Sequence, residues 1–304
     1  SIRARDKGQE MHSYIEKRGL LLGNEPNVGN TLIDMYVKCS MLLSAKKVFD
    51  MLPAQDVVSW TVLISGYTEH GHADRALECF KQMQEKGISP NAVTFLCIVR
   101  ACSSIKAIDK GCEIHGDIEC KGLLETDPLI GNVLVDMYAK CGFLNAAHAV
   151  FRRLSVRDVV SWTTLITGYV DHGRDEEALE FFEQMQLEGA FPNAATYVCI
   201  LKACASIRDI DKAYKIQEEI NKSSLERDAV ISTSLVDMYA KCGLFTRAQQ
   251  LFDKLQVRDV VSWNALVTGY IEYGHGEEAL ECFEQMQNEG IYPDEVTFLC
   301  ILKA

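Results

Sequence analysis

Twelve cysteines are the residues of this 304-residue chain best suited to covalent or metal chemistry, as disulfides or as zinc ligands. They recur at equivalent places, and Cys39, Cys141 and Cys242 occupy the matching phrases DMYVKCS, DMYAKCG and DMYAKCG. No two cysteines have C-x-x-C spacing, and none forms a tight cluster with histidines. The pattern favours small buried thiols that pack helices in a reducing compartment. We therefore predict no metal site and no cofactor.

A fragment of the zinc deaminase motif occurs at His275-Gly-Glu277. It matches the H-x-E that supplies a zinc ligand and a general acid/base, but the P-C-x-x-C half of the motif does not follow. We interpret it as a chance match in a turn between helices. The phosphate-binding loop, H-E-x-x-H and G-x-S-x-G motifs are also absent from the sequence. The chain is predicted not to be an enzyme.

The charge balance limits how the chain could bind nucleic acid. Its 31 Lys and Arg and 43 Asp and Glu give a formal net charge of -12, so a nucleic-acid binder would need a local basic face. No run approaches the roughly 18 apolar residues of a membrane-spanning helix, and we predict none. The opening SIRARDKGQE has neither an initiating Met nor an apolar signal core, and we expect it to lie in the middle of a longer protein.

The elements that must position any site are repeated helix pairs. DVVSW occurs three times, with Trp60, Trp162 and Trp263 spaced 102 and 101 residues apart. After each copy comes a similar stretch, such as RALECFKQMQEKGISPN, in which Ala76, Phe80 and Met83 form an amphipathic stripe. Gly71 separates the two helices of this copy, and Gly87 and Pro90 end the second helix.

The repeat of about 102 residues itself contains three helix pairs of different length. The short pairs are 26–56, 128–158 and 229–259; the 35-residue pairs are 57–91, 159–193 and 260–294; the remaining pairs are 92–127 and 194–228. Fragments 1–25 and 295–304 flank them. Because one pair cannot bury its apolar face alone, we predict an all-α, right-handed α-solenoid superhelix, one array over residues 1–304.

These lengths, with VVSWNALVTGY followed by EEALECFEQMQNEGIYPD, resemble pentatricopeptide repeats. The fixed order of units, DMYAKCG in the short ones and ILKACASI-like phrases in the long ones, is similar to the plant PLS subclass. In these terms 26–56, 128–158 and 229–259 are short, 57–91, 159–193 and 260–294 are P-type, 92–127 and 194–228 are long, and 1–25 and 295–304 are partial long repeats. Tetratricopeptide repeats fit less well, because the spacing is not a uniform 34 and Trp60 does not start a complete W-x-x-L-G.

The resemblance implies sequence-specific binding of single-stranded RNA, one base per repeat, as the specificity module of an organelle C-to-U editing factor. It further implies a mitochondrial or chloroplast location, accessory editing factors that bind the long repeats, and any deaminase-like catalytic domain outside this chain. A helical scaffold for protein partners is the alternative function. Since both ends divide a repeat, we also expect end-to-end self-association of the array, and no membrane contact.

In the family that this chain resembles, the fifth and last residues of a repeat read the base. The corresponding pairs are Asn30 with Asp56, Thr61 with Asn91, Asn132 with Asp158, Thr163 with Asn193, Thr233 with Asp259, and Asn264 with Asp294. A carboxylate only accepts hydrogen bonds, which suits the imino N–H of G and U, whereas an amide can donate to A and C. Adding the family's preference of Thr for purines and Asn for pyrimidines, we predict the target 5'-UAnUAnGU-3'. Helix capping is the alternative role for these residues.

The long units break the pair pattern, and two further sets of residues recur. Leu96 with Asp127 and Val198 with Asp228 have an apolar fifth residue, so we expect weak or no base discrimination there. Small apolar second residues resemble base-sandwiching positions, with core packing as the alternative: Val58, Val93, Leu129, Val160, Ala195, Val230 and Val261. Basic residues late in the first helices are candidates for phosphate contact, with a solvated helix face as the alternative: Lys38, Lys140, Lys241, Arg100 and Lys202.

Overall fold

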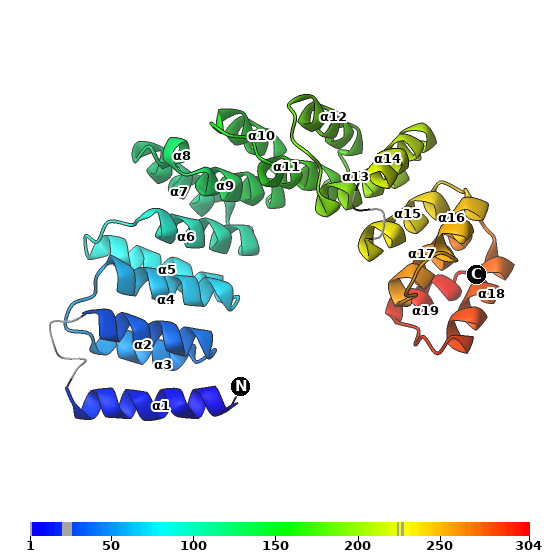
Figure 1. Ribbon diagram of the computed structural model, residues 1–304. Coiled ribbons are helices and arrows are strands. Elements are labelled where there is room, and N and C mark those ends of the chain that lie inside the picture. The colour runs from blue at the N-terminus through cyan, green and yellow to red at the C-terminus, as the bar shows by residue number, and fades with distance from the viewer. Residues whose placement is uncertain (1, 20–25, 224, 226–227) are drawn as a thin grey trace. The chain divides into compact units, whose positions relative to one another are not determined.

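The computed structural model describes residues 2–19, 26–223, 225 and 228–304. All regular secondary structure in these residues is helical, and they contain no strand. The chain divides into two compact units, 1–156 and 157–304, drawn from blue to green and from green to red (Figure 1). Two predicted repeats extend outside the described ranges, at residues 1 and 20–25 of fragment 1–25 and at 224, 226 and 227 of 194–228.

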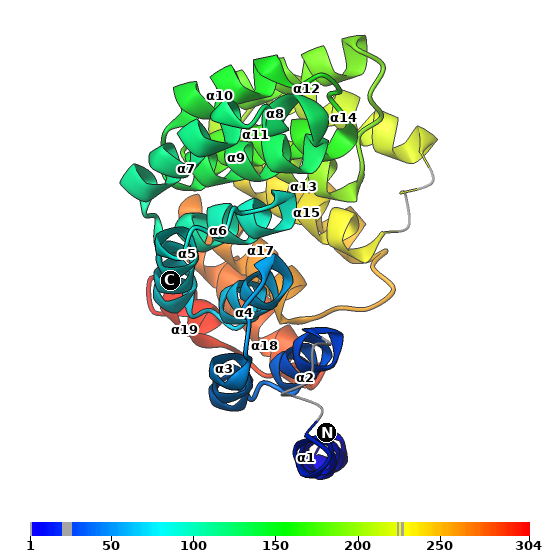
Figure 2. The ribbon, with the colours of Figure 1, turned by 90° about the vertical axis from the view of Figure 1, so that its left-hand side faces the viewer.

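The first compact unit is a stack of helix pairs (Figures 1 and 2). Its helices are α1 (Ile2–Lys17), α2 (Pro26–Lys38), α3 (Leu42–Met51), α4 (Val57–Glu69), α5 (Ala73–Glu85), α6 (Ala92–Ile105), α7 (Ile108–Cys120), α8 (Leu123–Thr126), α9 (Pro128–Lys140) and α10 (Leu144–Arg153). The first helices of the pairs, α2, α4, α6 and α9, pack on one another in succession and form one layer. The second helices form the other layer, in which α3, α5 and α7 each contact the first helices on both sides.

The second compact unit repeats this arrangement. Its helices are α11 (Val159–Asp171), α12 (Asp175–Leu187), α13 (Ala194–Ile207), α14 (Ile210–Lys222), α15 (Ala229–Lys241), α16 (Phe245–Phe252), α17 (Val260–Glu272), α18 (Gly276–Asn288) and α19 (Glu295–Ile301). The layer of first helices runs α11, α13, α15, α17, α19, and α12, α14, α16 and α18 pack against it. The predicted all-α solenoid of helix pairs is confirmed within each compact unit, whereas its handedness and its continuity as one array stay predictions.

The positions of the helices follow from the repeat pattern. Each first helix begins at the first residue of a repeat, as α4 does at Val57 and α6 at Ala92. The stripe of Ala76, Phe80 and Met83 on α5 is completely buried. Trp60 is also buried, and its ring meets Phe49 of the preceding pair edge-on at a centroid distance of 4.6 Å. Repeated tryptophans therefore join one helix pair to the next.

Two expectations about chemistry need correction. The cysteines are free as predicted, and burial raises the pKa of Cys79 to about 11 and of Cys102 to about 12, so these thiols are inert. Cys112 and Cys120, however, are exposed on α7 and not buried, although Cys112 Sγ accepts a hydrogen bond from the Tyr138 hydroxyl of α9 at 3.7 Å. His275 caps α18, and Gly276 and Glu277 already belong to its first turn, so the H-x-E match does not lie wholly in a turn.

Candidate nucleic-acid interface

The last residue of every complete repeat caps the first helix of the next repeat. Asp56, for example, accepts a hydrogen bond from the Ser59 N–H at 2.8 Å, and Asn91 accepts one from the Thr94 N–H at 2.9 Å. Asp158, Asn193, Asp259 and Asp294 make the same bond. Asp127 and Asp228 accept from the N–H two residues ahead, that of Leu129 and Val230, and Asp228 also accepts from the Ile231 N–H. Helix capping by the last residue is therefore confirmed at every complete repeat. A cap occupies only Oδ1, so Oδ2 of Asp or Nδ2 of Asn stays available to a ligand.

The structure brings several fifth residues next to the last residue of the same repeat. The Asn264 amide donates from Nδ2 to Asp294 Oδ1 at 2.9 Å, and Asn30 does so to Asp56 at 3.4 Å. In the pairs Thr61 with Asn91 and Thr163 with Asn193, the side chain of a third residue lies within hydrogen-bond distance of both members. No hydrogen bond joins Thr233 to Asp259 in the described structure. Asn132 and Asp158 belong to different compact units, and Asn132 is buried.

The joining residue is the third residue of the following repeat, which the sequence analysis missed. Thr94 Oγ1 lies 2.7 Å from Thr61 Oγ1 and 2.9 Å from Asn91 Oδ1. Thr196 makes the same contacts with Thr163 at 2.7 Å and with Asn193 at 3.0 Å. A Ser or Thr three residues after a capping Asn or Asp is the sequence signal that could have found it.

The long repeats lack this arrangement. Leu96 and Val198 are half-buried and carry no polar atom to share with a neighbour. The third residue of the repeat that follows each is Ile130 or Ile231, both completely buried and without a hydroxyl group. Asp127 and Asp228 therefore stand as caps without a polar partner at the fifth position.

The second residues of the repeats do not belong to the core. Val58 is 47% exposed and Leu129 is 61% exposed. Val93, Val160, Ala195, Val230 and Val261 are likewise exposed. Core packing is thus excluded for all seven, and each presents an apolar side chain to solvent in the first turn of a first helix, next to a capping residue.

Most of the basic candidates are already paired with acids. Lys38, Lys140 and Lys241 bind the Asp one turn earlier at 2.6, 2.9 and 2.8 Å, and Lys202 binds Asp171 of the neighbouring helix at 3.1 Å. Arg100 differs, since it makes no ion pair in the described structure. It lines a polar cavity of about 390 Å³ between α4, α6 and α9, together with Glu69 and Lys140. Arg100 is consequently the basic candidate whose charge is most available for phosphate.

The pair at the end of the second compact unit carries a stable negative charge. The backbone N–H of Thr297 and the Asn264 amide donate hydrogen bonds that lower the pKa of the Asp294 carboxyl below its usual value. Asp294 is exposed and remains ionised at neutral pH. Its chemistry at this position is that of a hydrogen-bond acceptor alone.

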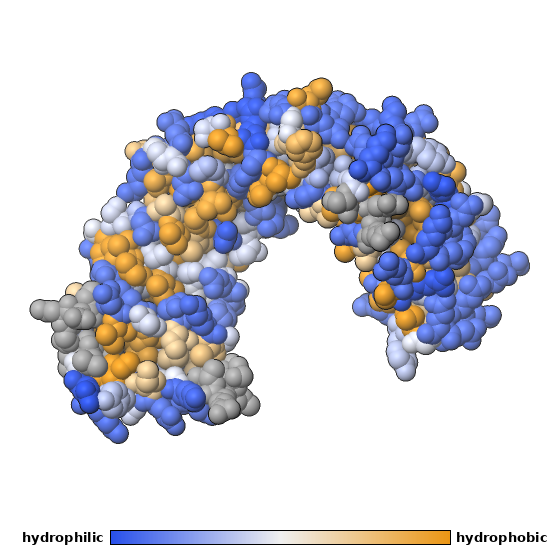
Figure 3. Space-filling model, viewed as in Figure 1, coloured by the Kyte–Doolittle hydropathy of each residue, from blue (hydrophilic) through white to orange (hydrophobic). Residues whose placement is uncertain are grey.

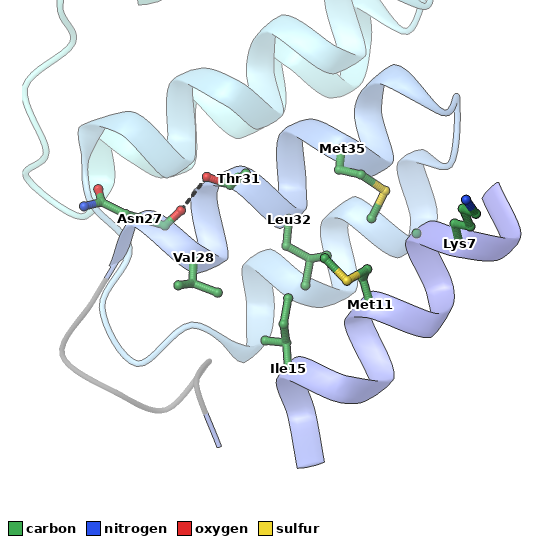
Figure 4. Close-up of a pocket in the computed structure, with 9 residues that line it drawn as sticks. Lys7, Met11, Ile15, Asn27, Val28, Thr31, Leu32 and Met35 are labelled. Atoms are coloured by element: carbon green, nitrogen blue, oxygen red, sulfur yellow. Dashed lines mark hydrogen bonds between the residues drawn. The ribbon is translucent and has the colours of Figure 1, made fainter. Parts of the chain in front are cut away.

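The amino-terminal helices form a separate cavity. An apolar cavity of about 470 Å³ lies between α1 and α2 and is lined by Met11, Ile15, Leu32 and Met35 (Figure 4). No member of a predicted reading pair lines it.

Within the described ranges, no group of three His, Cys, Asp or Glu side chains could hold a metal ion. No helix described here has the length and apolar character that crossing a membrane requires.

Comparison with known proteins identifies what the repeats are similar to. The PPR repeat family matches residues 55–104, 157–206 and 258–304, and the PPR repeat matches 30–57, 132–159 and 230–260. Two Arabidopsis thaliana relatives are pentatricopeptide repeat-containing proteins. The one named mitochondrial is 36% identical over 96% of this chain and 46% of its own length; the one named chloroplastic is 34% identical over 100% and 37%. The chain thus spans less than half of either relative.

A solved structure has the same fold. The crystal structure of the pentatricopeptide repeat protein PPR10 in complex with an 18-nt psaJ RNA element matches with a TM-score of 0.81. The match has 20% sequence identity and covers 98% of this chain and 45% of that chain. At 20% identity the likeness shows a shared fold alone.

Proposed function

Because the chain belongs to the pentatricopeptide repeat family, we propose that it binds single-stranded RNA sequence-specifically, one base per repeat, with the target 5'-UAnUAnGU-3'. The observation that carries the proposal is the recurrent coupling of the fifth residue to a solvent-accessible capping residue at the start of the next first helix. In the Asn264 and Asp294 pair this coupling is a direct hydrogen bond of 2.9 Å. Capping and base reading are compatible, because they use different atoms of the same side chain.

The hydrogen-bond chemistry supports the assignment of bases. At Asn91 and Asn193 the cap uses Oδ1, so the amide can offer only its Nδ2 protons, which suit the imino nitrogen of A or C. At Asp56, Asp158, Asp259 and Asp294 the free Oδ2 can only accept, which suits the imino N–H of U or G. The exposed apolar second residues would flank the bases. The choice between purine and pyrimidine rests on the family's preference of Thr or Asn at the fifth position.

The finer parts of the proposal extend to the whole protein. Repeat lengths of 31, 35 and 35 or 36 residues in fixed order support the PLS subclass. Membership in it implies a role as the specificity module of a C-to-U editing factor in a mitochondrion or chloroplast, with accessory editing factors on the long repeats. For this chain we propose binding without catalysis.

The test is binding of the purified chain to a short RNA with UAnUAnGU and to a version in which both A residues are G, over a salt series. Each wrong base should cost about 1–3 kcal/mol, and each neutralised phosphate should add about -0.7 to the slope of log K against log salt. Substituting Asn91→Asp and Asn193→Asp together should reverse the preference. Binding that ignores both the sequence and this variant would refute base reading and favour the protein-scaffold alternative.

A further inference from the structure

A buried threonine hydroxyl group contacts the side-chain amide oxygen of Asn91, Asn193 and Asn264, each a member of a reading pair. Thr94 and Thr196 are completely buried, and each lies between the fifth residue and the last residue of the preceding repeat. Their Oγ1 atoms are 2.9 and 3.0 Å from Oδ1 of Asn91 and Asn193. Their backbone N–H groups donate to the same two oxygens, both at 2.9 Å. Two donors from one residue therefore hold the same end of each amide.

This double contact gives the amide a direction. Turning the amide by 180° would place its Nδ2 protons against the backbone N–H of the threonine, and Oδ1 would lose both hydrogen bonds that it accepts there. With Oδ1 held, Nδ2 is the atom left for a base. An Asp carboxylate has two equivalent oxygens and needs no such orientation.

The other third residues agree with this distinction. Ser59, Ser161 and Ser262 follow Asp56, Asp158 and Asp259, and their hydroxyl groups donate to the backbone carbonyl of the Asp, at 2.9, 2.8 and 2.8 Å. Thr297 follows Asp294, and there the amide belongs to the fifth residue. Thr297 Oγ1 lies 2.6 Å from Asn264 Oδ1 and 2.9 Å from Asp294 Oδ1. Where Ser59 stands instead of a Thr, the buried Oδ1 of Asn30 has no hydrogen-bond partner among the residues that the structure describes.

We infer that the threonine at the third place of the following repeat is a positioning residue, which orients the side-chain amide of the reading pair and thereby sharpens its base preference. Thr94 and Thr196 orient Asn91 and Asn193 so that Nδ2 faces an adenine. This inference rests on the proposed function. It adds a third residue to the reading pairs that contain Asn91, Asn193 and Asn264, and this residue contacts the pair and not the RNA.

The inference is tested with Thr94→Val and Thr196→Val in the full chain, which remove the hydroxyl groups and keep the side-chain shape. The bonds from the backbone N–H of residues 94 and 196 to the amide oxygens stay in place, while the backbone N–H groups of Asn91 and Asn193 lose an Oγ1 acceptor at 3.3 and 3.2 Å. The preference for A over G at the second and fifth target positions should fall about five- to tenfold, as expected for one lost hydrogen bond. The preferences at the U and G positions should not change. We expect the larger loss at Thr196. Next to Thr94, the Thr61 hydroxyl donates to the Val57 carbonyl at 2.6 Å, so the single proton of the Thr94 hydroxyl is divided between Thr61 and Asn91.

Two controls match these variants. Thr94→Ser with Thr196→Ser keeps both hydroxyl groups and should keep the preference for A. Ser161→Ala removes a buried hydroxyl group that bonds only to a backbone carbonyl, and it should leave every base preference as it is. Thermal unfolding followed by circular dichroism checks that all variants fold.

The outcomes separate the inference from the proposed function. If the unmodified chain prefers A and the valine variant keeps that preference in full, the inference is wrong and the proposed function stands. If the unmodified chain shows no preference, both are wrong. If the valine variant does not fold, Ser59→Thr replaces it. A threonine hydroxyl group that bonds to Asn30 Oδ1 should sharpen the base preference at the first target position. An unchanged preference at that position would overturn the inference.

Discussion

At the scale of single residues, a capping side chain has one atom in the fold and one atom for a ligand. Asp294 illustrates this division, since its Oδ1 accepts from Thr297 and Asn264 while the residue is exposed. Such a residue is held in place by the helix that it caps, so its free atom is preorganised without a separate scaffold. Preorganised groups lose less entropy when a ligand binds.

The pH dependence of Asp294 follows from its lowered pKa. Because the folded-state pKa lies below the ordinary value of about 4, the carboxylate's contribution to stability is complete above that pH and is lost only as the pH falls through the folded-state pKa. We therefore expect the preference for U at the last target position to be the same at pH 7 and pH 5, measured by RNA binding. A loss of that preference at pH 5 would contradict the assigned ionisation. Asp294→Asn should shift the preference toward C at both pH values.

At the scale of elements, close approach of neighbouring first helices sets the spacing of the reading pairs. A Cβ atom added to Gly269 of α17 would lie 2.5 Å from Cβ of Ala240 and 3.0 Å from its backbone carbonyl carbon on α15. These helices pack directly against each other. Glycine is required here because the helix backbones themselves approach, and a backbone cannot rotate out of the way.

Gly269→Ala should therefore destabilise the chain by about 1–3 kcal/mol, as overpacking does. Gly116→Ala is the matched control, because Gly116 lies inside α7 with nothing within 4 Å of an added Cβ. That control should stabilise by roughly 0.5–1 kcal/mol through helix propensity. Chemical denaturation of both variants measures the difference, and equal effects of the two would show that the α15–α17 approach is not tight.

Ion pairs between and within helices decide which basic residues have a charge available for phosphate. Lys140 is neutralised by Asp136 one turn earlier on α9, whereas Arg100 of α6 has no ion pair in the described structure. We expect Arg100→Gln to reduce the slope of log K against log salt by about 0.7, the value for one phosphate on a single strand. Lys140→Gln should change the slope less. Titrations of both variants with the target RNA compare them, and a larger change for Lys140 would reverse the assignment.

At the scale of the whole molecule, the sequence predicts complementary parts of a long repeat at residues 1–25 and 295–304. Between α7 and α9, α6 packs on both helices, and Ile114 and Met137 are completely buried. At the equivalent place between α1 and α2, Met11 is 62% exposed beside the apolar cavity, and hydrophobic surface is visible there (Figures 3 and 4). The α19 segment EVTFLCI matches AVTFLCI of α6, yet its Phe298 is 51% exposed whereas Phe95 is buried.

We therefore expect α19 of a second copy to enter the groove between α1 and α2, as α6 does inside the chain. Head-to-tail contacts of this kind do not close on themselves, so the mean size should grow with concentration. Sedimentation velocity over a dilution series measures this growth. Met11→Asp should reduce it, while Leu187→Asp, at an exposed site on α12, should leave it unchanged. A chain that stays monomeric at every concentration would rule out this contact.

The sequence by itself determined the local structure of this protein. The apolar stripes and the residues at helix ends indicated where helices begin, where they end and which faces they bury, because these features depend on residues within one or two turns of each other. Periods of 31, 35 and 36 residues indicated how often the helix pair recurs. Tyrosine, tryptophan and cysteine phrases recurring with the repeat predicted the all-α solenoid. The candidate pairs came from the same register together with the family resemblance.

Only the tertiary structure decided which side chains are partners across repeats. The contact of Thr94 with Thr61 joins residues 33 positions apart, and the pairing of Lys202 with Asp171 joins residues 31 positions apart. The exposure of the second residues, of Cys112 and of Cys120 likewise depends on which faces the neighbouring helices cover. Repeat periodicity places residues on equivalent faces, but helix packing sets the distances of a few ångströms on which a hydrogen bond or an ion pair depends.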